Sequence, residues 1–329
     1  MRSARCIASL GLETVDRVLS TAHAWKRQSH GKHLADKILG MLFFNPSLRT
    51  RTSFEAVMMR GGGNAIVLDA GNDTWKLEDQ LGAIMDGDRP EHLKEAASVL
   101  SRYVDALAVR TFAAGVDDDL DHEDRIIRAF EQYATVPIVS MESAREHPCQ
   151  GLADLMTIED QFGSARGVPV TLTWAPHIKP LPKAVPNSFL LTAAARGCEV
   201  RVVHPPGFEL HPGVVAEAQG YAAASGGTIS FSHDQAAALQ GARAVYAKSW
   251  GPSTASNLPR ASVAQHTDWM ISPQQIAQAA DDAIFLHCLP VRRNVEVADA
   301  VLDGPSSRVI DEAENRFHVQ RALLEWLLH

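Results

Sequence analysis

The chain has 329 residues and a formal net charge of −8. Its composition, 46% hydrophobic and 21% charged, is that of a globular protein and excludes disorder over most of the length. At about 100–200 residues per domain, the length predicts two domains. The acidic balance argues against nucleic acid or a membrane surface as a partner. It does not exclude a small anionic substrate, because a binding site depends on local charge.

The cysteine pattern and the N-terminus indicate a cytoplasmic protein. The four cysteines are widely spaced, and no pair forms the C-x-x-C motif of a zinc knuckle or redox dithiol. Free thiols in a reducing compartment are therefore expected. The chain has no apolar run of about 18 residues, and its first residues lead into no apolar signal segment. We therefore expect neither secretion nor a membrane span.

Short apolar runs alternate with helix-length segments along the chain. The predicted strands are 38–44, 65–68, 106–109, 137–140, 168–173, 199–203, 228–231, 244–247 and 283–287. The predicted helices are 50–60, 90–102, 123–133, 151–162, 185–196, 214–225 and the amphipathic segment 311–328. This alternation predicts an α/β fold with parallel sheets covered on both faces. Two doubly wound sheets fit the length better than one, with a break near 140–150.

Nucleotide-binding loops are not evident in the sequence. No G-x-G-x-x-G follows a predicted strand, and no G-x-x-x-x-G-K-[ST] is present. The glycines Gly61, Gly62 and Gly63 follow a predicted helix, so they are interpreted as its C-terminal stop.

The first chemical motif is the segment 43–54, which follows a predicted strand and opens a helix. Because ligands of open parallel sheets bind beyond the carboxyl ends of the strands, this position favours a functional role. Ser47 or Thr50 can cap the helix, which leaves backbone N–H groups for an anion. Arg49 adds a bidentate donor for phosphate oxygens. An ordinary helix start with a solvated arginine pair explains the same residues equally well.

The second motif combines Glu142 with His147, Pro148, Cys149 and Gln150. The His147 ring can donate a hydrogen bond to a carbonyl oxygen, and the Gln150 side chain can recognise an amide. A polar helix start at Pro148 is the simpler alternative.

The third motif is the segment 287–294, which follows the last predicted strand. The bond between Leu289 and Pro290 is a candidate cis peptide. Arg292 and Arg293 are candidate carboxylate binders, although surface charge is the alternative for at least one of them. Arg110 and Lys248 each come at the end of a strand or just past one, which favours a functional role for both.

Together these motifs resemble a known family. Residues 47–51, Ser-Leu-Arg-Thr-Arg, resemble the carbamoyl-phosphate signature of the aspartate and ornithine carbamoyltransferases, whose usual form is Ser-x-Arg-Thr-Arg. His-Pro-Cys-Gln at 147–150 and His-Cys-Leu-Pro at 287–290 are similar to the family's second and third signatures. The resemblance implies the aspartate/ornithine carbamoyltransferase fold. It also implies a carbamoyl-phosphate domain of residues 1–143 plus helix 311–329, and an acceptor domain of residues 144–310.

The resemblance extends to one branch of the family. Residues 246–251 lack the Ser-Met-Gly loop of ordinary ornithine carbamoyltransferases, and the chain resembles the branch acting on Nα-acylated ornithine. In that branch the acetyl type has Glu where the succinyl type has Pro, and Pro90 stands here. A carboxylate would repel the free carboxylate of a succinyl group, whereas Pro adds no charge. Glu296 also stands where the acetyl type has Lys. N-succinylornithine is therefore the implied acceptor, and N-acetylornithine is the alternative.

The resemblance also implies the roles of individual residues. The implied catalytic residues are Arg49, Arg110 and His147. The implied carbamoyl-phosphate ligands are Ser47, Leu48, Arg49, Thr50, Trp75, Arg110, His147, Pro148, Cys149, Gln150, Cys288, Leu289 and Arg316. The implied acylornithine ligands are Glu142, His177, Lys248, Leu289, Arg292 and Pro90. Trp75 would come from a neighbouring subunit of a homotrimer with shared active sites.

The implied reaction transfers a carbamoyl group from carbamoyl phosphate to the side-chain amine of N-succinylornithine, in arginine biosynthesis. It calls for no metal and no organic cofactor, since the acyl phosphate is already activated. A protein of another class, a non-catalytic carbamoyl-phosphate-binding protein on the same scaffold, is the remaining alternative.

Overall fold

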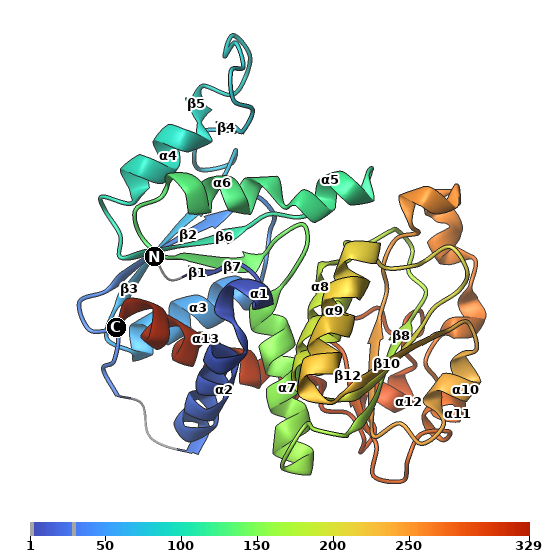
Figure 1. Ribbon diagram of the computed structural model, residues 1–329. Helices are drawn as coiled ribbons and strands as arrows, with labels where there is room; N and C mark the ends of the chain where they lie inside the picture. The colour runs from blue at the N-terminus through green and yellow to red at the C-terminus, as the bar shows by residue number, and fades with distance from the viewer. Residues whose placement is uncertain (1–2, 28–30) are drawn as a thin grey trace. The chain divides into compact units, whose positions relative to one another are not determined.

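The computed structural model describes residues 3–27 and 31–329, so the first two residues of the predicted first domain lie outside it (Figure 1). The chain divides into two compact units. Unit 1 comprises Met1–Ala113, Glu123–Cys149 and Arg316–His329, and unit 2 comprises Ala114–His122 and Gln150–Asn315. The sequence-based boundaries differ from these: they place 114–122 and 311–315 in the first domain, and 144–149 in the second. Within the described ranges, no helix is both long enough and apolar enough for a membrane span.

Unit 1 contains a five-stranded parallel sheet in the order β1-β7-β6-β2-β3. Its strands are Ser3–Ala4 (β1), Ile38–Phe43 (β2), Asn64–Asp69 (β3), Ala106–Arg110 (β6) and Ile138–Glu142 (β7). Every residue of β6 and β7 is buried, as expected for central strands of a sheet covered on both faces. The four longer strands were predicted, whereas the two-residue β1 was not.

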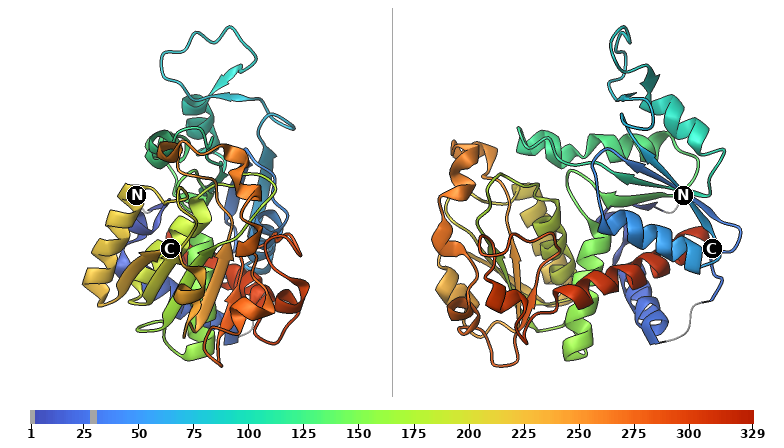
Figure 2. Two further views of the ribbon diagram at one scale, coloured as in Figure 1. Left: turned by 90° about the vertical axis from the view of Figure 1, so that its right-hand side faces the viewer. Right: turned by 180° about the vertical axis from the view of Figure 1, so that it is seen from behind.

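Helices cover both faces of this sheet (Figures 1 and 2). Its helices are Ile7–Leu10 (α1), Leu12–Arg27 (α2), Arg49–Arg60 (α3), Leu93–Leu100 (α4) and Arg125–Tyr133 (α6). Helices α4 and α6 lie on one face, where Leu107, Ile127 and Phe130 belong to a common apolar core. Helices α2 and α3 lie on the other face with the C-terminal part of α13 (Val309–Leu328). Helix α3 stops before Gly61, and Gly62 has a φ of 87°, which confirms the helix-stop interpretation of these glycines.

An arm, defined as residues 71–92, extends from unit 1 beyond α4 (Figure 1). It holds the parallel strands Leu77–Glu78 (β4) and Glu91–His92 (β5). The helix predicted from residue 90 begins only at Leu93, because the residues after Pro90 pair with β4 instead. Ion pairs within unit 1 tie the arm together, with Asp79 bridging Arg89 at 3.3 Å and Arg125 at 2.6 Å.

Unit 2 contains a second five-stranded parallel sheet, in the order β10-β9-β8-β11-β12. Its strands are Pro169–Trp174 (β8), Glu199–Val203 (β9), Thr228–Ser232 (β10), Ala244–Lys248 (β11) and Ile284–Leu286 (β12). All five were predicted within two residues of these bounds. With the sheet of unit 1, they confirm the prediction of two doubly wound parallel sheets.

Helices lie on both faces of the second sheet as well (Figure 1). Its helices are Pro148–Phe162 (α7, from Gln150), Ala184–Ala195 (α8), Pro212–Ser225 (α9), Gln235–Leu239 (α10), Pro273–Ile276 (α11) and Asp299–Leu302 (α12). All twelve residues of α8 are buried, because this helix lies between the sheet and α9. On the other face, Val245, Phe285 and Val301 share one apolar core. The short helix Asp118–Glu123 (α5) and three 3₁₀ turns, Thr254–Ser256, Arg260–Ala264 and Thr267–Trp269, were not predicted, and neither were α1, α2, α10, α11 and α12.

Candidate active site

Each of the two sheets changes winding direction at one point of its own, and each unit carries candidate residues at its own switch point. In unit 1 the chain proceeds from β2 to β3 on one side and then to β6 on the other, so β2 and β6 flank the switch point. In unit 2 the corresponding strands are β8 and β11. Ligands of doubly wound sheets bind at the carboxyl ends of the strands at such points. The residues expected there were Ser47, Arg49 and Arg110 in unit 1, and His177 and Lys248 in unit 2.

The loop after β2 is held in a defined turn at the start of α3. The Thr50 backbone N–H donates to the Ser47 hydroxyl at 3.1 Å, as expected for a capping serine. This bond occupies one backbone donor that the sequence assigned to phosphate. The Thr50 hydroxyl is buried and accepts a hydrogen bond of 2.7 Å from Arg316 Nη2. The start of α3 and the last helix are thereby joined inside unit 1.

Three arginines and one histidine of unit 1 are close enough to influence one another's charge. Burial, followed by the positive charges of Arg316, Arg110 and Arg49, holds the pKa of His147 well below its ordinary value of 6.5. Burial also lowers the pKa of Arg316, and Arg110 and Arg49 act in the same direction. His147 is therefore neutral at pH 7 and able to donate one hydrogen bond. Three guanidinium groups gathered around it repel one another unless an anion joins them.

Arg110 is fixed by a carboxylate at the end of the neighbouring strand. Its Nη1 donates to Glu142 at 2.7 Å, and its guanidinium lies 4.6 Å from the centroid of the Phe112 ring. Both partners of the ion pair are 10% exposed at their side chains. Among the described residues, the buried Nε atoms of Arg110 and Arg316 find no hydrogen-bond acceptor. These donors fit an anion such as phosphate.

The second motif starts a helix and also contributes polar groups. Pro148 is the first residue of α7, so the predicted helix start at Pro148 is confirmed. Burial raises the pKa of the Cys149 thiol to about 12, which excludes a reactive thiolate at neutral pH. In unit 2, Gln150 Nε2 donates to Asp154 at 2.7 Å and to Glu312 at 2.8 Å. This leaves the side-chain oxygen of Gln150 to accept from an amide.

Glu312 joins the second and third motifs. While one of its oxygens accepts from Gln150, the other accepts from the His287 backbone N–H at 2.8 Å. The His287 ring in turn accepts from the Leu289 N–H at 2.9 Å. The Leu289–Pro290 bond is cis, as the sequence suggested. Leu289 has a φ of 54°, a left-handed conformation that is strained for a branched side chain and is typical of functional turns.

The candidate acceptor residues of unit 2 form a connected group around a buried carboxylate. Arg292 Nε donates to His177 Nε2 at 3.0 Å, and the Arg292 backbone N–H donates to Glu296 at 2.7 Å. Burial is the main cause that lowers the pKa of His177, so its ring is neutral. The other ring nitrogen of His177, Nδ1, lies 2.7 Å from the Lys179 carbonyl oxygen. His177 and Lys248 are 6% exposed, so substrate groups held there would be largely desolvated.

Glu296 is wholly buried, and its charge matters to this group. Burial raises the pKa of Glu296, but His287, Lys248 and the Arg292 N–H more than offset this and leave it below its ordinary value. Its second oxygen lies 3.7 Å from His287 Nε2. In the sequence, Glu296 was singled out only because the acetyl-type enzymes have Lys at this position, and it was given no role. Glu312 stands in the segment 311–316 that resembles the acylornithine branch, but it was given no role, because a single acidic residue in an amphipathic helix carries no distinguishing signal.

Other residues predicted as ligands do not belong to the groups described above. Trp75 is 66% exposed and Leu48 is 79% exposed, and Pro90 is an exposed residue of the arm. Glu142, expected at the acceptor, lies in unit 1 as the partner of Arg110. Arg293 pairs on the surface with Asp299 and Asp303, which settles which of the two neighbouring arginines is surface charge. Over the residues described, no group of three or more His, Cys, Asp or Glu side chains is arranged to hold a metal ion.

Comparison with known proteins accounts for nearly the whole chain. Residues 2–160 match the family description "Aspartate/ornithine carbamoyltransferase, carbamoyl-P binding domain", and residues 182–327 match its "Asp/Orn binding domain". The N-acetylornithine carbamoyltransferase of Xanthomonas campestris is 42% identical over 319 residues, which cover 95% of this chain and 94% of the relative. The N-succinylornithine carbamoyltransferase of Bacteroides thetaiotaomicron is 44% identical over 281 residues, which cover 85% and 84%.

A solved structure agrees with the fold over its full length. It is a glutamate-to-proline mutant of N-acetyl-L-ornithine transcarbamylase, complexed with carbamyl phosphate and N-succinyl-L-norvaline. It has a TM-score of 0.96 and 40% sequence identity, and the match covers 99% of this chain and 100% of that one. The two switch-point groups thus occur in a fold shared with a carbamoyl-phosphate complex, and the chain belongs to the aspartate/ornithine carbamoyltransferase family.

Proposed function

We propose that this protein transfers the carbamoyl group of carbamoyl phosphate to the side-chain amine of Nα-succinylornithine, giving N-succinylcitrulline and phosphate. The observation that carries the proposal is the cluster of Arg49, Arg110 and Arg316 around a neutral His147 in unit 1. Such a cluster combines high positive charge with a neutral hydrogen-bond donor. Carbamoyl phosphate needs both, because it presents a phosphate dianion and a carbonyl oxygen side by side.

The phosphate is assigned to the arginines and to the start of α3. A twelve-residue helix directs its N-terminal backbone donors and positive dipole end at the turn of residues 47–50. Arg49 and Arg316 supply guanidinium donors beside this turn. As the C–O bond to phosphate breaks, negative charge grows on the leaving oxygens, so the same contacts strengthen in the transition state.

The carbonyl oxygen is assigned to Arg110 and His147. Attack of the amine places negative charge on this oxygen, and a charged donor with a neutral donor stabilises it. The ion pair with Glu142 fixes the direction of the Arg110 side chain. The carbamoyl NH₂ is assigned to the side-chain oxygen of Gln150 and to the backbone carbonyls of Cys288 and Leu289, since an NH₂ group requires acceptors.

The acceptor is assigned to His177, Lys248 and Arg292. Lys248 and Arg292 are cations, and the two carboxylates of a succinylated amino acid are the groups they would bind. The attacking amine must be neutral, although a free amine of this kind has a pKa of about 10.4. The departing phosphate is the proton acceptor we propose, so no side chain of the protein is required as a base.

The choice of succinylornithine over acetylornithine rests on Pro90. A succinyl group differs from an acetyl group by a free carboxylate, which a nearby glutamate would repel. Pro90, which is exposed on the arm, carries no charge and therefore does not repel the succinyl carboxylate. By family resemblance, the arm would serve a neighbouring subunit of a homotrimer. The exposed apolar residues of the arm, Trp75, Leu81 and Ile84, are suited to burial against a second copy.

A three-substrate assay tests the proposal. Purified protein and carbamoyl phosphate are mixed with ornithine, N-acetylornithine or N-succinylornithine, and the citrulline product and phosphate are measured. The proposal expects the highest kcat/KM with N-succinylornithine. Faster turnover of N-acetylornithine would make the protein an acetyl-type enzyme, and binding of carbamoyl phosphate without turnover of any acceptor would identify a non-catalytic binding protein.

A further inference from the structure

The acidic run from Asp117 to Asp121 has no part in the proposed chemistry, yet it is held firmly within unit 2. Asp117 accepts the backbone N–H groups of Asp119 and Leu120 and so caps the short helix α5. Asp121 folds the preceding loop back by accepting the N–H groups of Ala114 and Gly115, each at 2.8 Å. These two carboxylates therefore shape the segment itself.

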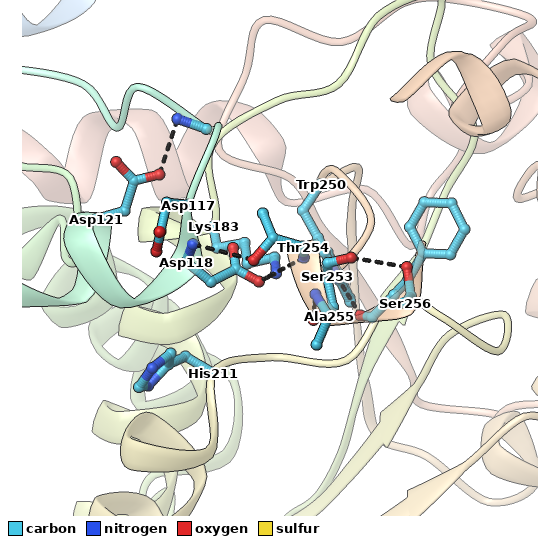
Figure 3. A network of polar contacts seen from close by, with 12 residues as sticks. Asp117, Asp118, Asp121, Lys183, His211, Trp250, Ser253, Thr254, Ala255 and Ser256 are labelled. Atoms are coloured by element: carbon cyan, nitrogen blue, oxygen red, sulfur yellow. Dashed lines mark hydrogen bonds and ion pairs between the residues drawn. The ribbon is translucent and has the colours of Figure 1, made fainter. Parts of the chain in front are cut away.

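Asp118, in contrast, faces away from its own segment (Figure 3). One carboxylate oxygen accepts from Lys183 Nζ at 2.8 Å and from the Thr254 backbone N–H at 3.0 Å. The Asp118 backbone N–H donates in return to the Thr254 hydroxyl at 3.2 Å. Asp118 thus contacts two separate loops of unit 2 with three hydrogen bonds.

These two loops carry the candidate acceptor ligands. Lys183 ends the loop between β8 and α8, which contains His177. Thr254 lies in the loop after β11, the strand that ends at Lys248. The strands β8 and β11 are adjacent and pair Lys248 with Trp174, so the loops leave the sheet side by side at the switch point.

Backbone hydrogen bonds join the loops after β8 and β11, so that a shift of one loop affects the other. Gly251 N–H donates to the Leu181 carbonyl at 3.0 Å, and His177 N–H donates to the Val263 carbonyl at 3.2 Å. A change in the loop after β11 therefore reaches the backbone of His177 directly. Asp118 is a charged group that contacts both loops, at Lys183 in one and at Thr254 in the other.

The contact is a charge-assisted one in a half-buried place. The side chains of Lys183 and Asp118 are 11% and 18% exposed. Burial alone raises the pKa of Asp118, but the bonds from Lys183 and the Thr254 N–H bring it below its ordinary value. Charge-assisted hydrogen bonds are about twice as strong as neutral ones, so the Asp118 carboxylate is a strong link between Lys183 and Thr254.

We propose that Asp118 is a positioning residue for the acceptor substrate, which holds the loops after β8 and β11 in the arrangement that presents His177 and Lys248. This inference rests on the proposed carbamoyl transfer and deepens it. Asp118 touches no reacting atom in this scheme, and its effect is confined to the acceptor side.

The central experiment compares Asp118→Asn with Asp119→Asn. The first change keeps the shape of the side chain but removes the charge that holds Lys183. The second removes a neighbouring carboxylate, 92% exposed, whose partner is His211. For Asp118→Asn we expect the KM for acylornithine to rise about tenfold, as for loss of one charge-assisted bond, with the Kd for carbamoyl phosphate unchanged. For Asp119→Asn we expect wild-type values.

The outcomes separate this inference from the proposed function. Absence of turnover in the wild-type protein would refute the proposed function itself. Wild-type turnover with an unchanged acceptor KM in Asp118→Asn would overturn the positioning role. Equal weakening of carbamoyl phosphate and acceptor would indicate a general structural role and overturn it as well.

Two further variants keep the test decisive if Asp118→Asn fails to fold. Thr254→Val removes only the hydroxyl that accepts from Asp118, so a smaller rise of the same KM is expected. Lys183→Met with Asp118→Asn removes both charges together and leaves no unpaired ion. We expect this double variant to fold and to show a higher acceptor KM than wild type with an unchanged Kd for carbamoyl phosphate, and wild-type acceptor KM values in both variants would contradict the inference.

Discussion

Arg316 donates a hydrogen bond of 2.7 Å to the Thr50 hydroxyl, although 266 residues separate the two in the chain. The contact brings the C-terminal helix α13 to the start of α3, at the switch point of the first sheet. It thereby adds a third guanidinium group to Arg49 and Arg110. The charge of the proposed anion site is therefore assembled from segments far apart in the sequence.

Replacing Arg316 with Met should weaken carbamoyl-phosphate binding without unfolding the protein. Arg316 is buried beside two like charges, so its removal relieves repulsion while losing one hydrogen bond. We expect the free energy of unfolding without ligand to change by less than about 1 kcal/mol. The KM for carbamoyl phosphate should rise about 100-fold, measured by initial rates. Arg293→Met, which alters an exposed arginine, is the control, and unchanged binding in Arg316→Met would refute the assignment.

His147 should make the stability of the protein depend on pH below about 6.5. Its pKa in the folded chain lies well below the ordinary value of 6.5, so the unfolded chain binds the proton first as the pH falls. The stabilisation is complete above pH 6.5 and declines as the pH drops toward the folded pKa. Denaturant titrations between pH 7.5 and 5, the range this shift selects, should show a shallower decline for His147→Gln than for wild type. Identical slopes would mean that His147 is not held neutral.

Neutralising Glu296 should impair the acceptor side alone. Glu296→Gln keeps an oxygen for the Arg292 N–H but removes the negative charge that acts on Lys248 and His287. We expect a loss of about 1–3 kcal/mol in the free energy of unfolding, together with a higher KM for acylornithine. The KM for carbamoyl phosphate should not change. A variant with wild-type acceptor kinetics would show that the carboxylate is only structural.

Pro90 provides a direct test of acceptor choice. In Pro90→Glu, the ratio of kcat/KM for N-succinylornithine to that for N-acetylornithine should fall at least about tenfold, because like charges repel. Pro90→Gln introduces a side chain of nearly the same size without charge and is the matched control. A fall of the same size in both variants would attribute the preference to shape, and no change in either would remove Pro90 as the determinant.

Trp75 should complete an active site in another copy of the chain. At carbamoyl-phosphate concentrations near the wild-type KM, Trp75→Ala and Arg316→Met are each expected to be nearly inactive, whereas trimers refolded from a mixture should regain part of the wild-type rate. In such trimers some sites receive an intact Trp75 from one subunit and an intact Arg316 from another. A mixture as inactive as its components would show that each chain uses its own Trp75.

The longer strands, most of the longer helices and most of the chemistry-bearing segments follow from local sequence patterns. The α/β alternation, the helix start after β2 and the His147 motif all express local patterns, namely apolar runs, capping residues and prolines directly after strands. The short elements β1, α1, α5, α10, α11, α12 and the 3₁₀ turns were not predicted, because a few residues carry too little periodicity. The sixteen-residue helix α2 was missed as well. The helix expected from residue 90 was shortened because pairing of β4 with β5, a tertiary contact, outweighed the local pattern.

The contacts of individual polar residues, in contrast, depend on tertiary structure. Strand pairing of β6 with β7 places Glu142 on Arg110, a contact that the sequence did not indicate, while its contact with the acceptor stays a prediction. Arg292 and Arg293 are neighbours with the same chemistry, but one donates to His177 while the other pairs with surface aspartates. Glu296, Glu312 and Asp118 gained importance only through burial and through partners distant in sequence. Local sequence fixes backbone preference within a few residues, whereas the charge state and partners of a side chain follow from groups that the fold brings together.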